Sequence, residues 1–298
     1  MRLLIAGWQG QLARAFVDAA PARSDIVALA LGRPALDLCE VRAIERALSE
    51  DRPNVVINTA GYTAVDKAED EPERAVALNR DGARLLAKVA AERGVPIIHM
   101  STSNVFGGEK EAPYVETDAA APINVYGRSK LEGEAHVRAA NPRHIILRTS
   151  WIFSPFGGNF IAEIVQKARR GEPLRIVTDQ LGSPTYAHDL ATAIFDIAAL
   201  AHASRSTESA PIWGTYHIAN AGGPATWHAA AQQACRAAGL DTAAEAITPI
   251  TSGELATRAP RPRNSSLDTS YLASHLGLTL RDWRAALADA VAALSTPS

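Results

Sequence analysis

The chain has 298 residues, of which 47% are hydrophobic and 21% charged, and its formal net charge at pH 7 is −2. This length provides a full hydrophobic core in one or two domains. Charges of both signs are interspersed, which argues against a nucleic-acid partner or a membrane-surface partner. The apolar runs are much shorter than the roughly 20 residues of a membrane helix, and the first one leads into a glycine turn rather than a cleavage site. We therefore expect a cytoplasmic protein.

Runs rich in valine and isoleucine alternate with helix-periodic stretches through the first half of the chain. This alternation predicts parallel βαβ units, hence an α/β fold with a Rossmann-type doubly wound parallel sheet. The expected strands are residues 2–6, 25–30, 54–58, 96–100 and 144–147. The main expected helices are residues 72–93, 131–140, 188–201, 227–238 and 283–294, with a polar loop at 203–211 and a short strand at 215–219.

The pattern loosens after residue 148, where aromatic residues, glycines and prolines interrupt the alternation. We expect residues 1–150 to form the Rossmann domain, with residues 174–202 returning to it. Residues 151–173 and 203–298 are expected to form a smaller C-terminal lobe. In such a fold the ligand lies at the carboxyl ends of the strands, in the cleft between the lobes, so the second lobe is expected to bind substrate.

A glycine turn follows the first strand and opens the first helix, with the sequence Gly7-Trp8-Gln9-Gly10-Gln11-Leu12-Ala13. Glycines in this position let backbone N–H groups and the positive end of the helix approach a pyrophosphate. The spacing is GxxGxxA, and a plain strand-to-helix turn is the alternative interpretation. Its place at the start of a βαβ series favours binding of a dinucleotide through Gly7 and Gly10.

The second strand ends without the acidic residue that would accept hydrogen bonds from the adenosine ribose of NAD. It ends at Leu31-Gly32 and is followed by Arg33, whose guanidinium suits the 2′-phosphate of NADP. NADPH is therefore the favoured cofactor, with NADH as the alternative. A solvated Arg33 is the competing interpretation, and Asp37 remains a candidate contact for the adenosine.

Two further strand ends carry small or hydroxyl residues. The third strand ends in Asn58-Thr59-Ala60-Gly61-Tyr62-Thr63, where small residues permit close approach of a cofactor, although a tight turn would need the same residues. The fourth strand ends in Ser101-Thr102-Ser103-Asn104, which places hydroxyl groups at the expected cleft.

Tyr126 and Lys130 have the i, i+4 spacing that puts two side chains on one face of a helix. Reduction of a ketone by hydride creates an alkoxide, which needs a proton donor within hydrogen-bond reach. Tyr126 is the candidate donor, Lys130 its neighbouring cation, and Thr102 a hydrogen-bond donor to the substrate oxygen. A phenol pKa of about 10 would have to fall by about two to three units for efficient exchange near neutrality, with Lys130 and an oxidised nicotinamide as the available cations.

The order of these motifs resembles the extended short-chain dehydrogenases/reductases. More narrowly, Ala64-Val65-Asp66-Lys67-Ala68-Glu69, Pro122-Ile123-Asn124-Val125-Tyr126-Gly127, Asp179-Gln180-Leu181-Gly182-Ser183-Pro184-Thr185 and Arg261-Pro262-Arg263-Asn264-Ser265 resemble the dTDP-4-dehydrorhamnose reductases. The resemblance implies NADPH- or NADH-dependent reduction of the C4 keto group of a nucleotide sugar. It also implies cofactor contacts at Gly10, Gln11, Leu12, Asp37, Leu38, Gly61, Tyr62, Thr63, Tyr126 and Lys130, and substrate contacts at Thr102, Ser103 and Trp151.

The chain also departs from this family. Ser103 stands where the family commonly has aspartate, and the glutamates that hold magnesium at a dimer interface in some members correspond to Ala15 and His188. We therefore expect no metal, and a homodimer stays an open alternative. The competing functions are another nucleotide-sugar 4-keto reductase, such as one forming dTDP-6-deoxy-talose, a related epimerase or dehydratase, and a non-catalytic regulatory subunit with the same fold.

Overall fold

Six parallel strands form one sheet in the computed structural model, which describes residues 1–208 and 210–294. Their order across the sheet is β10-β5-β4-β3-β1-β2, so the chain runs outward from β1 to β2 and then crosses back to β3. This order confirms the predicted doubly wound α/β fold and places its switch point beside β1. The bounds are β1 (Arg2–Ala6), β2 (Val27–Leu31), β3 (Val55–Asn58), β4 (Ile97–Thr102), β5 (His144–Thr149) and β10 (Gly214–His217).

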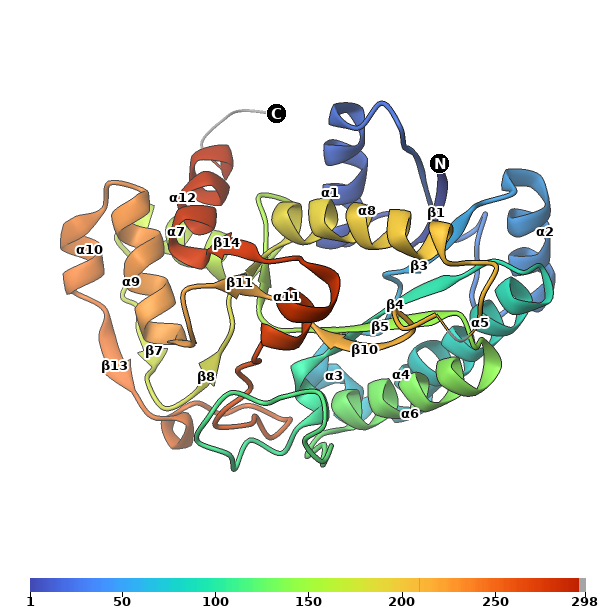
Figure 1. The fold of residues 1–298 in the computed structure, drawn as a ribbon. Helices are drawn as coiled ribbons and strands as arrows, with labels where there is room; N and C mark the ends of the chain where they lie inside the picture. The colour runs from blue at the N-terminus through green and yellow to red at the C-terminus, as the bar shows by residue number, and fades with distance from the viewer. Residues whose placement is uncertain (209, 295–298) are drawn as a thin grey trace.

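Helices cover both faces of this sheet, which is why residues of its central strands are buried on both sides instead of alternating between buried and exposed positions. All residues of β3 and β4 are buried. One face packs against α1 (Gln11–Ala19) and α8 (Ala187–Ala203). The other packs against α2 (Val41–Asp51), α5 (Ala83–Glu92) and α6 (Val125–Ala140), as Figure 1 shows.

The single helix expected at 72–93 is interrupted by one wide turn. It consists of α4 (Pro72–Val76), a π-helical segment (Ala77–Gly82) and α5. In the wide turn lies Asn79, whose amide donates to the carbonyl of Tyr62 at 3.1 Å and to Ser129 Oγ at 2.9 Å. A π-turn inserts one residue without changing the apolar pattern of its flanks, so periodicity does not reveal it.

A smaller lobe, on the left of Figure 1, packs four helices against short strand pairs. The helices are α7 (Phe160–Arg169), α9 (Trp227–Ala237), α10 (Asp241–Glu245) and α12 (Trp283–Leu294). The pairs are β6 (Ile152–Phe153) with β9 (Thr185–Tyr186), β7 (Arg175–Val177) with β13 (Thr248–Ile250), β8 (Leu181–Gly182) with β12 (Ala225–Thr226), and β11 (Asn220–Ala221) with β14 (Leu280–Asp282). The remaining α-helices of the described residues are α3 (Val65–Asp70) and α11 (Ser270–Leu276).

The two lobes exchange segments more often than we expected from the sequence. Helix α8 packs on α1, whereas β7, which we had placed with the Rossmann domain, pairs with β13 of the smaller lobe. Residues 214–217, expected in the smaller lobe, form the edge strand β10 and pair with β5. Strand partners depend on tertiary contacts that local pattern does not encode. Residue 209 of the predicted loop and residues 295–298 of the predicted lobe lie outside the described residues.

Candidate active site

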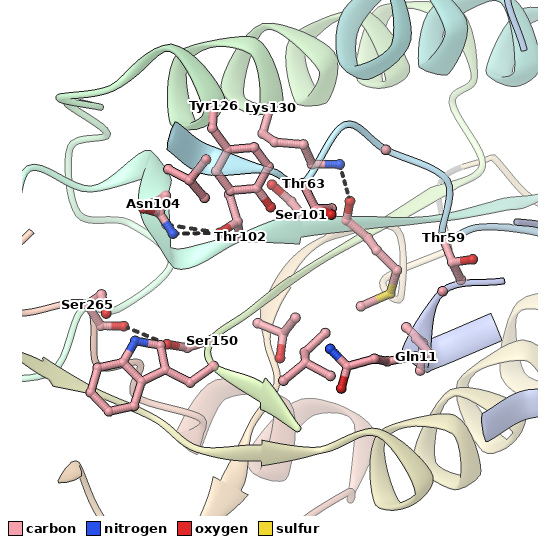
Figure 2. Close-up of a pocket in the computed structure, with 18 of the residues that line it drawn as sticks. Gln11, Thr59, Thr63, Ser101, Thr102, Asn104, Tyr126, Lys130, Ser150 and Ser265 are labelled. Atoms are coloured by element: carbon pink, nitrogen blue, oxygen red, sulfur yellow. Dashed lines mark hydrogen bonds between the residues drawn. The ribbon is translucent and has the colours of Figure 1, made fainter. Parts of the chain in front are cut away.

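A cavity of about 540 Å³ opens at the carboxyl ends of the central strands, between the sheet and the smaller lobe. Figure 2 shows Tyr126 and Lys130 on one side of it and Gln11 and Thr59 on another. Among the residues predicted from the sequence, those that line the cavity are Gly10, Gln11, Leu12, Gly61, Thr63, Thr102, Tyr126, Lys130 and Trp151. Those that do not line it are Gly7, Arg33, Asp37, Leu38, Tyr62 and Ser103.

The glycine turn has the shape that a diphosphate needs. Gly7 has φ +114°, and a Cβ there would lie 2.6 Å from Thr59 Oγ1, so only glycine fits without strain. Gly10 precedes α1 and offers no side chain to cap the helix, and a Cβ at this position would meet no heavy atom within 4 Å. Gly10, Gln11 and Leu12 line the cavity, so the positive end of α1 adjoins it, which suits an anion.

The end of β2 keeps Arg33 exposed, whereas its neighbours are engaged. Asp37 accepts a hydrogen bond from the backbone N–H of Cys39 at 2.9 Å, and Leu38 is buried. Trp8, which is half exposed, packs across Gly32, where a Cβ would lie 2.1 Å from the indole. An indole at the mouth of the turn is a feature that sequence reasoning missed, although a bulky aromatic residue in a glycine turn was a visible signal.

The loop after β3 is fixed by the π-helical segment. Asn79 Oδ1 accepts from the backbone N–H of Tyr62 at 2.8 Å, and a Cβ on Gly61 would lie 3.0 Å from the same oxygen. The Tyr62 hydroxyl donates to Glu71 at 2.9 Å. The backbone N–H, the carbonyl and the phenol of Tyr62 are therefore all bonded within the protein.

The N-terminus of α6 delivers the candidate proton donor to the end of β4. Asn124 caps the helix by accepting from the backbone N–H of Gly127 at 2.7 Å, so the helix begins where the Tyr126–Lys130 spacing requires. A Cβ on Gly127 would lie 2.1 Å from the carbonyl oxygen of Asn104, so this glycine permits the close contact between α6 and the β4 turn. Figure 2 shows Tyr126 and Lys130 projecting from α6 toward Thr102 and Ser101.

The phenol of Tyr126 is held protonated. Burial raises the pKa of Tyr126 above its usual value of 10, while an interaction with the Thr102 hydroxyl acts in the opposite direction. This direction is opposite to the lowering that we expected, because desolvation outweighs the stabilising contacts and the ammonium of Lys130 is bonded elsewhere. A protonated phenol is nevertheless the form that a proton donor needs.

Lys130 lies against the sheet, 5% exposed, and its Nζ donates to the carbonyl of Met100 at 2.6 Å. Burial lowers the pKa of Lys130 to about 8, with the charge of Glu134 opposing that change. Glu134 is fully buried and accepts two hydrogen bonds from Arg148, at 2.9 and 2.7 Å, and one from Ser101.

The structure buries Ser103, for which we expected a substrate contact, and places Asn104 at the cavity. Ser103 is 1% exposed in a short 3₁₀ turn and does not reach the cavity. Asn104 lines the cavity instead, and its Nδ2 donates to Thr102 Oγ1 at 3.2 Å. The turn rotates successive side chains by about a third of a circle, which strand alternation at this position would not predict.

An aromatic pair forms the wall on the side of the smaller lobe. Trp151 has φ +42° and stacks on Trp227, with ring centroids 3.5 Å apart and planes 11° apart. Trp227 Nε1 donates to Gln180 at 3.2 Å, and Gly182 lies directly against the Trp151 indole. Sequence reasoning found Trp151 and missed Trp227, because nothing local links a tryptophan at the start of α9 to the end of β5.

Two motifs behind the family resemblance hold segments near the cleft together, one between the lobes and one within the smaller lobe. Asp66 accepts from Arg261 at 2.8 Å and from the backbone N–H of Ala259 at 3.0 Å, which ties α3 to the cavity wall formed by Arg261 and Pro262. Asp179 accepts from the hydroxyl of Ser252 at 2.7 Å. These carboxylates hold the cleft together rather than project into it.

Ala15 is buried, and His188 Nε2 lies 2.7 Å from Asp18 at the surface. Among residues 1–208 and 210–294, no three His, Cys, Asp or Glu side chains are grouped so that they could hold a metal ion. Likewise, none of the helices in that part of the chain is long and apolar enough to cross a membrane.

Comparisons with known proteins agree over nearly the whole chain. Residues 1–296 match the family model described as RmlD substrate binding domain. A dTDP-4-dehydrorhamnose reductase of Sinorhizobium fredii is 43% identical over 95% of this chain and 94% of its own length.

Solved structures of this family also superpose closely. A dTDP-4-dehydrorhamnose reductase from Clostridium acetobutylicum has a TM-score of 0.90 and 32% identity, covering 99% of this chain and 100% of its own. One from Bacillus anthracis in complex with NADP has a TM-score of 0.87 and 30% identity, covering 97% and 98%. The chain therefore belongs to the dTDP-4-dehydrorhamnose reductase family.

Proposed function

We propose that this protein is a dTDP-4-dehydrorhamnose reductase, which reduces the C4 keto group of dTDP-4-dehydro-L-rhamnose to give dTDP-L-rhamnose with NADPH as reductant. The observation that carries the proposal is one cavity lined by Tyr126, Thr102, Lys130 and the glycine turn at Gly10. The names of the relatives and the NADP complex of the Bacillus anthracis protein support the same substrate and cofactor.

The residues of the turn and of the strand ends suit NADPH. The diphosphate would lie over Gly10, Gln11 and Leu12, at the start of α1, where backbone N–H groups and the helix dipole favour negative charge. Arg33 is exposed and would pair with the 2′-phosphate, whereas Asp37 is bonded to backbone, which makes NADPH the better partner than NADH. The remaining contacts that we propose, mostly through backbone, are Gly7, Leu38, Gly61, Tyr62 and Thr63. When bound, NADPH supplies the hydride.

Tyr126 would donate its phenolic proton to the C4 oxygen as negative charge develops there. Thr102, next to the phenol and fixed by Asn104, would donate to the same oxygen and orient the keto group. Lys130 would hold the nicotinamide ribose and place a positive charge near the phenolate that remains. Trp151 would form an apolar wall for the sugar. Ser103 would act through the backbone of the turn, since its side chain is buried.

The lobes have separate tasks in this proposal. The sheet with α1, α2, α5, α6 and α8 would hold the cofactor, and the smaller lobe with Trp151 and Trp227 would cover the sugar nucleotide. The partner that we propose is a small-molecule nucleotide sugar, and the site needs no metal. A cytoplasmic location would give access to both NADPH and the nucleotide sugar.

The test is an NADPH-oxidation assay at 340 nm with dTDP-4-dehydrorhamnose generated in situ. We expect turnover that requires the keto sugar, and we expect dTDP-glucose, which has no keto group, to support none. Absence of oxidation by a folded protein that binds NADPH would refute the proposed function and would favour a non-catalytic role for this fold.

A further inference from the structure

Behind Lys130 the structure places a histidine that no water can reach. His99 lies on β4, is fully buried, and has its Nε2 3.5 Å from Lys130 Nζ. On the other side of the ring, its Nδ1 lies 3.1 Å from Asn58 Nδ2 on β3. The protonation state of this ring, between the Asn58 amide and Lys130, therefore affects the position and the charge of Lys130.

The orientation of Asn58 determines which ring nitrogen carries the proton. Asn58 Oδ1 accepts from the backbone N–H of Ala60 at 3.2 Å, and a backbone N–H can only donate. The amide nitrogen therefore faces His99, so Nδ1 of the ring must be the acceptor. Burial also lowers the pKa of His99 well below its usual value, which keeps the ring neutral. A neutral ring that accepts at Nδ1 carries its proton on Nε2.

That proton points at Lys130. An ammonium and a ring N–H are both donors, and a separation of 3.5 Å is longer than a good hydrogen bond between nitrogens. The ammonium bonds to the carbonyl of Met100 at 2.6 Å instead. We infer that His99, fixed as its Nε2–H tautomer by Asn58, is a positioning residue that turns the Lys130 ammonium toward Met100 and opposes its charge.

Other groups around Lys130 also affect the stability of its charged form. On α6, Glu134 favours the ammonium, and its own charge is matched by Arg148 from β5 and by Arg138 on α6. Tyr126, also on α6, is held protonated and neutral. His99 is thus the polar group from the sheet that disfavours the ammonium, in the same direction as burial.

This inference rests in part on the proposed function, because it predicts a change in the pH dependence of reduction. If catalysis needs protonated Lys130, kcat/KM falls as pH rises through the lysine pKa. Replacing His99 by phenylalanine removes the opposing N–H, and replacing it by glutamine supplies an acceptor. Both changes should raise the lysine pKa and shift the alkaline limb upward by about one pH unit. His144→Gln on the neighbouring strand β5, whose ring Nδ1 faces the carbonyl of Asn141, is the matched control.

The direction of the shift separates the inference from its opposite. If His99 accepted from Lys130, then His99→Phe would move the alkaline limb downward. A downward shift, or a profile that superposes on that of the unchanged enzyme, would overturn the inference. A purely structural role would lower kcat or stability without moving the limb, and that result would overturn it too.

A second measurement needs no turnover and no variant that must fold. ¹⁵N NMR of the unchanged protein with labelled histidine and asparagine reports the tautomer of the ring hydrogen-bonded to the Asn58 amide. We expect a protonated Nε2 and an unprotonated Nδ1 from pH 6 to pH 9. The reverse tautomer, or an imidazolium, would overturn the inference even if the protein reduces dTDP-4-dehydrorhamnose as proposed. The expected tautomer in a protein without that activity would refute only the proposed function.

Discussion

Replacing Glu134 by glutamine should strongly destabilise the protein, because it removes the charge from a fully buried carboxylate. Arg148, 5% exposed, would lose the negative charge of its partner and one of its two acceptor oxygens, and its Nη1 already has no partner. Ser101 would lose a charged acceptor as well. Breaking a buried ion pair by removing one partner costs about 3–5 kcal/mol. We therefore expect the unfolding equilibrium constant to rise more than about a hundredfold, since 1.36 kcal/mol corresponds to a factor of ten.

The assay is urea unfolding at pH 7, followed by circular dichroism and tryptophan fluorescence. Glu132→Gln is the matched control, on the same helix, because Glu132 is 42% exposed and contacts Arg80 at 3.4 Å. An exposed pair contributes about 0–1 kcal/mol, so this control should unfold almost as the unchanged protein does. Equal effects of the two substitutions would refute the reasoning.

The Glu134–Arg148 ion pair also predicts how the stability of the protein depends on pH. Burial alone would raise the pKa of Glu134, but its hydrogen bonds with Arg148 and Ser101 and the charges of Arg148 and Arg138 outweigh burial and lower it. A pKa that is lower in the folded state gives stability at pH values above the unfolded pKa, and this stability is lost as pH falls through the folded pKa. The difference between the unchanged protein and Glu134→Gln should therefore be full at pH 7 and shrink under acidic conditions.

Three further substitutions test the site. Tyr126→Phe should lower kcat at least about a hundredfold in the NADPH-oxidation assay and leave NADPH affinity unchanged, since it deletes only a proton donor. The surface control Tyr271→Phe should change neither kcat nor NADPH affinity. Full activity of Tyr126→Phe would exclude the role of Tyr126 as proton donor. Gly7→Ala should weaken NADPH binding and cost more than about 1 kcal/mol of stability, because of its φ and the Thr59 contact. Gly171→Ala, with positive φ but open space around it, should leave NADPH binding intact. Arg33→Ala should raise the KM for NADPH about tenfold and leave that for NADH unchanged; an equal change for both would place the 2′-phosphate elsewhere.

The sequence predicted the sheet and the reactive pair well, because both depend on local pattern. The first five strands of the sheet fall within a few residues of their predicted bounds, since each contains a short apolar run between turns. The Tyr126–Lys130 pair needed only a helix start at the right place, and Asn124 provides it. The glycine turn was readable because positive φ and close backbone contact leave few alternatives to glycine.

What the sequence could not predict depends on contacts between distant segments. Trp227, at the start of α9, stacks on Trp151, which follows β5 and lies 76 positions earlier in the chain. No local pattern encodes such a pair. Asn104 rather than Ser103 lines the cavity because of a 3₁₀ turn, and the orientation of the Asn79 side chain depends on a π-helical turn. The raised pKa of Tyr126 follows from burial, which is known only once the packing is known.

The central claim is that this site delivers hydride to C4 of the sugar and a proton to its oxygen. The most direct measurement reduces dTDP-4-dehydrorhamnose with NADPH deuterated at the transferred position and locates the label by NMR. We predict one deuterium at C4 of a product with the rhamnose configuration. Label at another carbon, no label in the sugar, or a product with the talose configuration would contradict the claim.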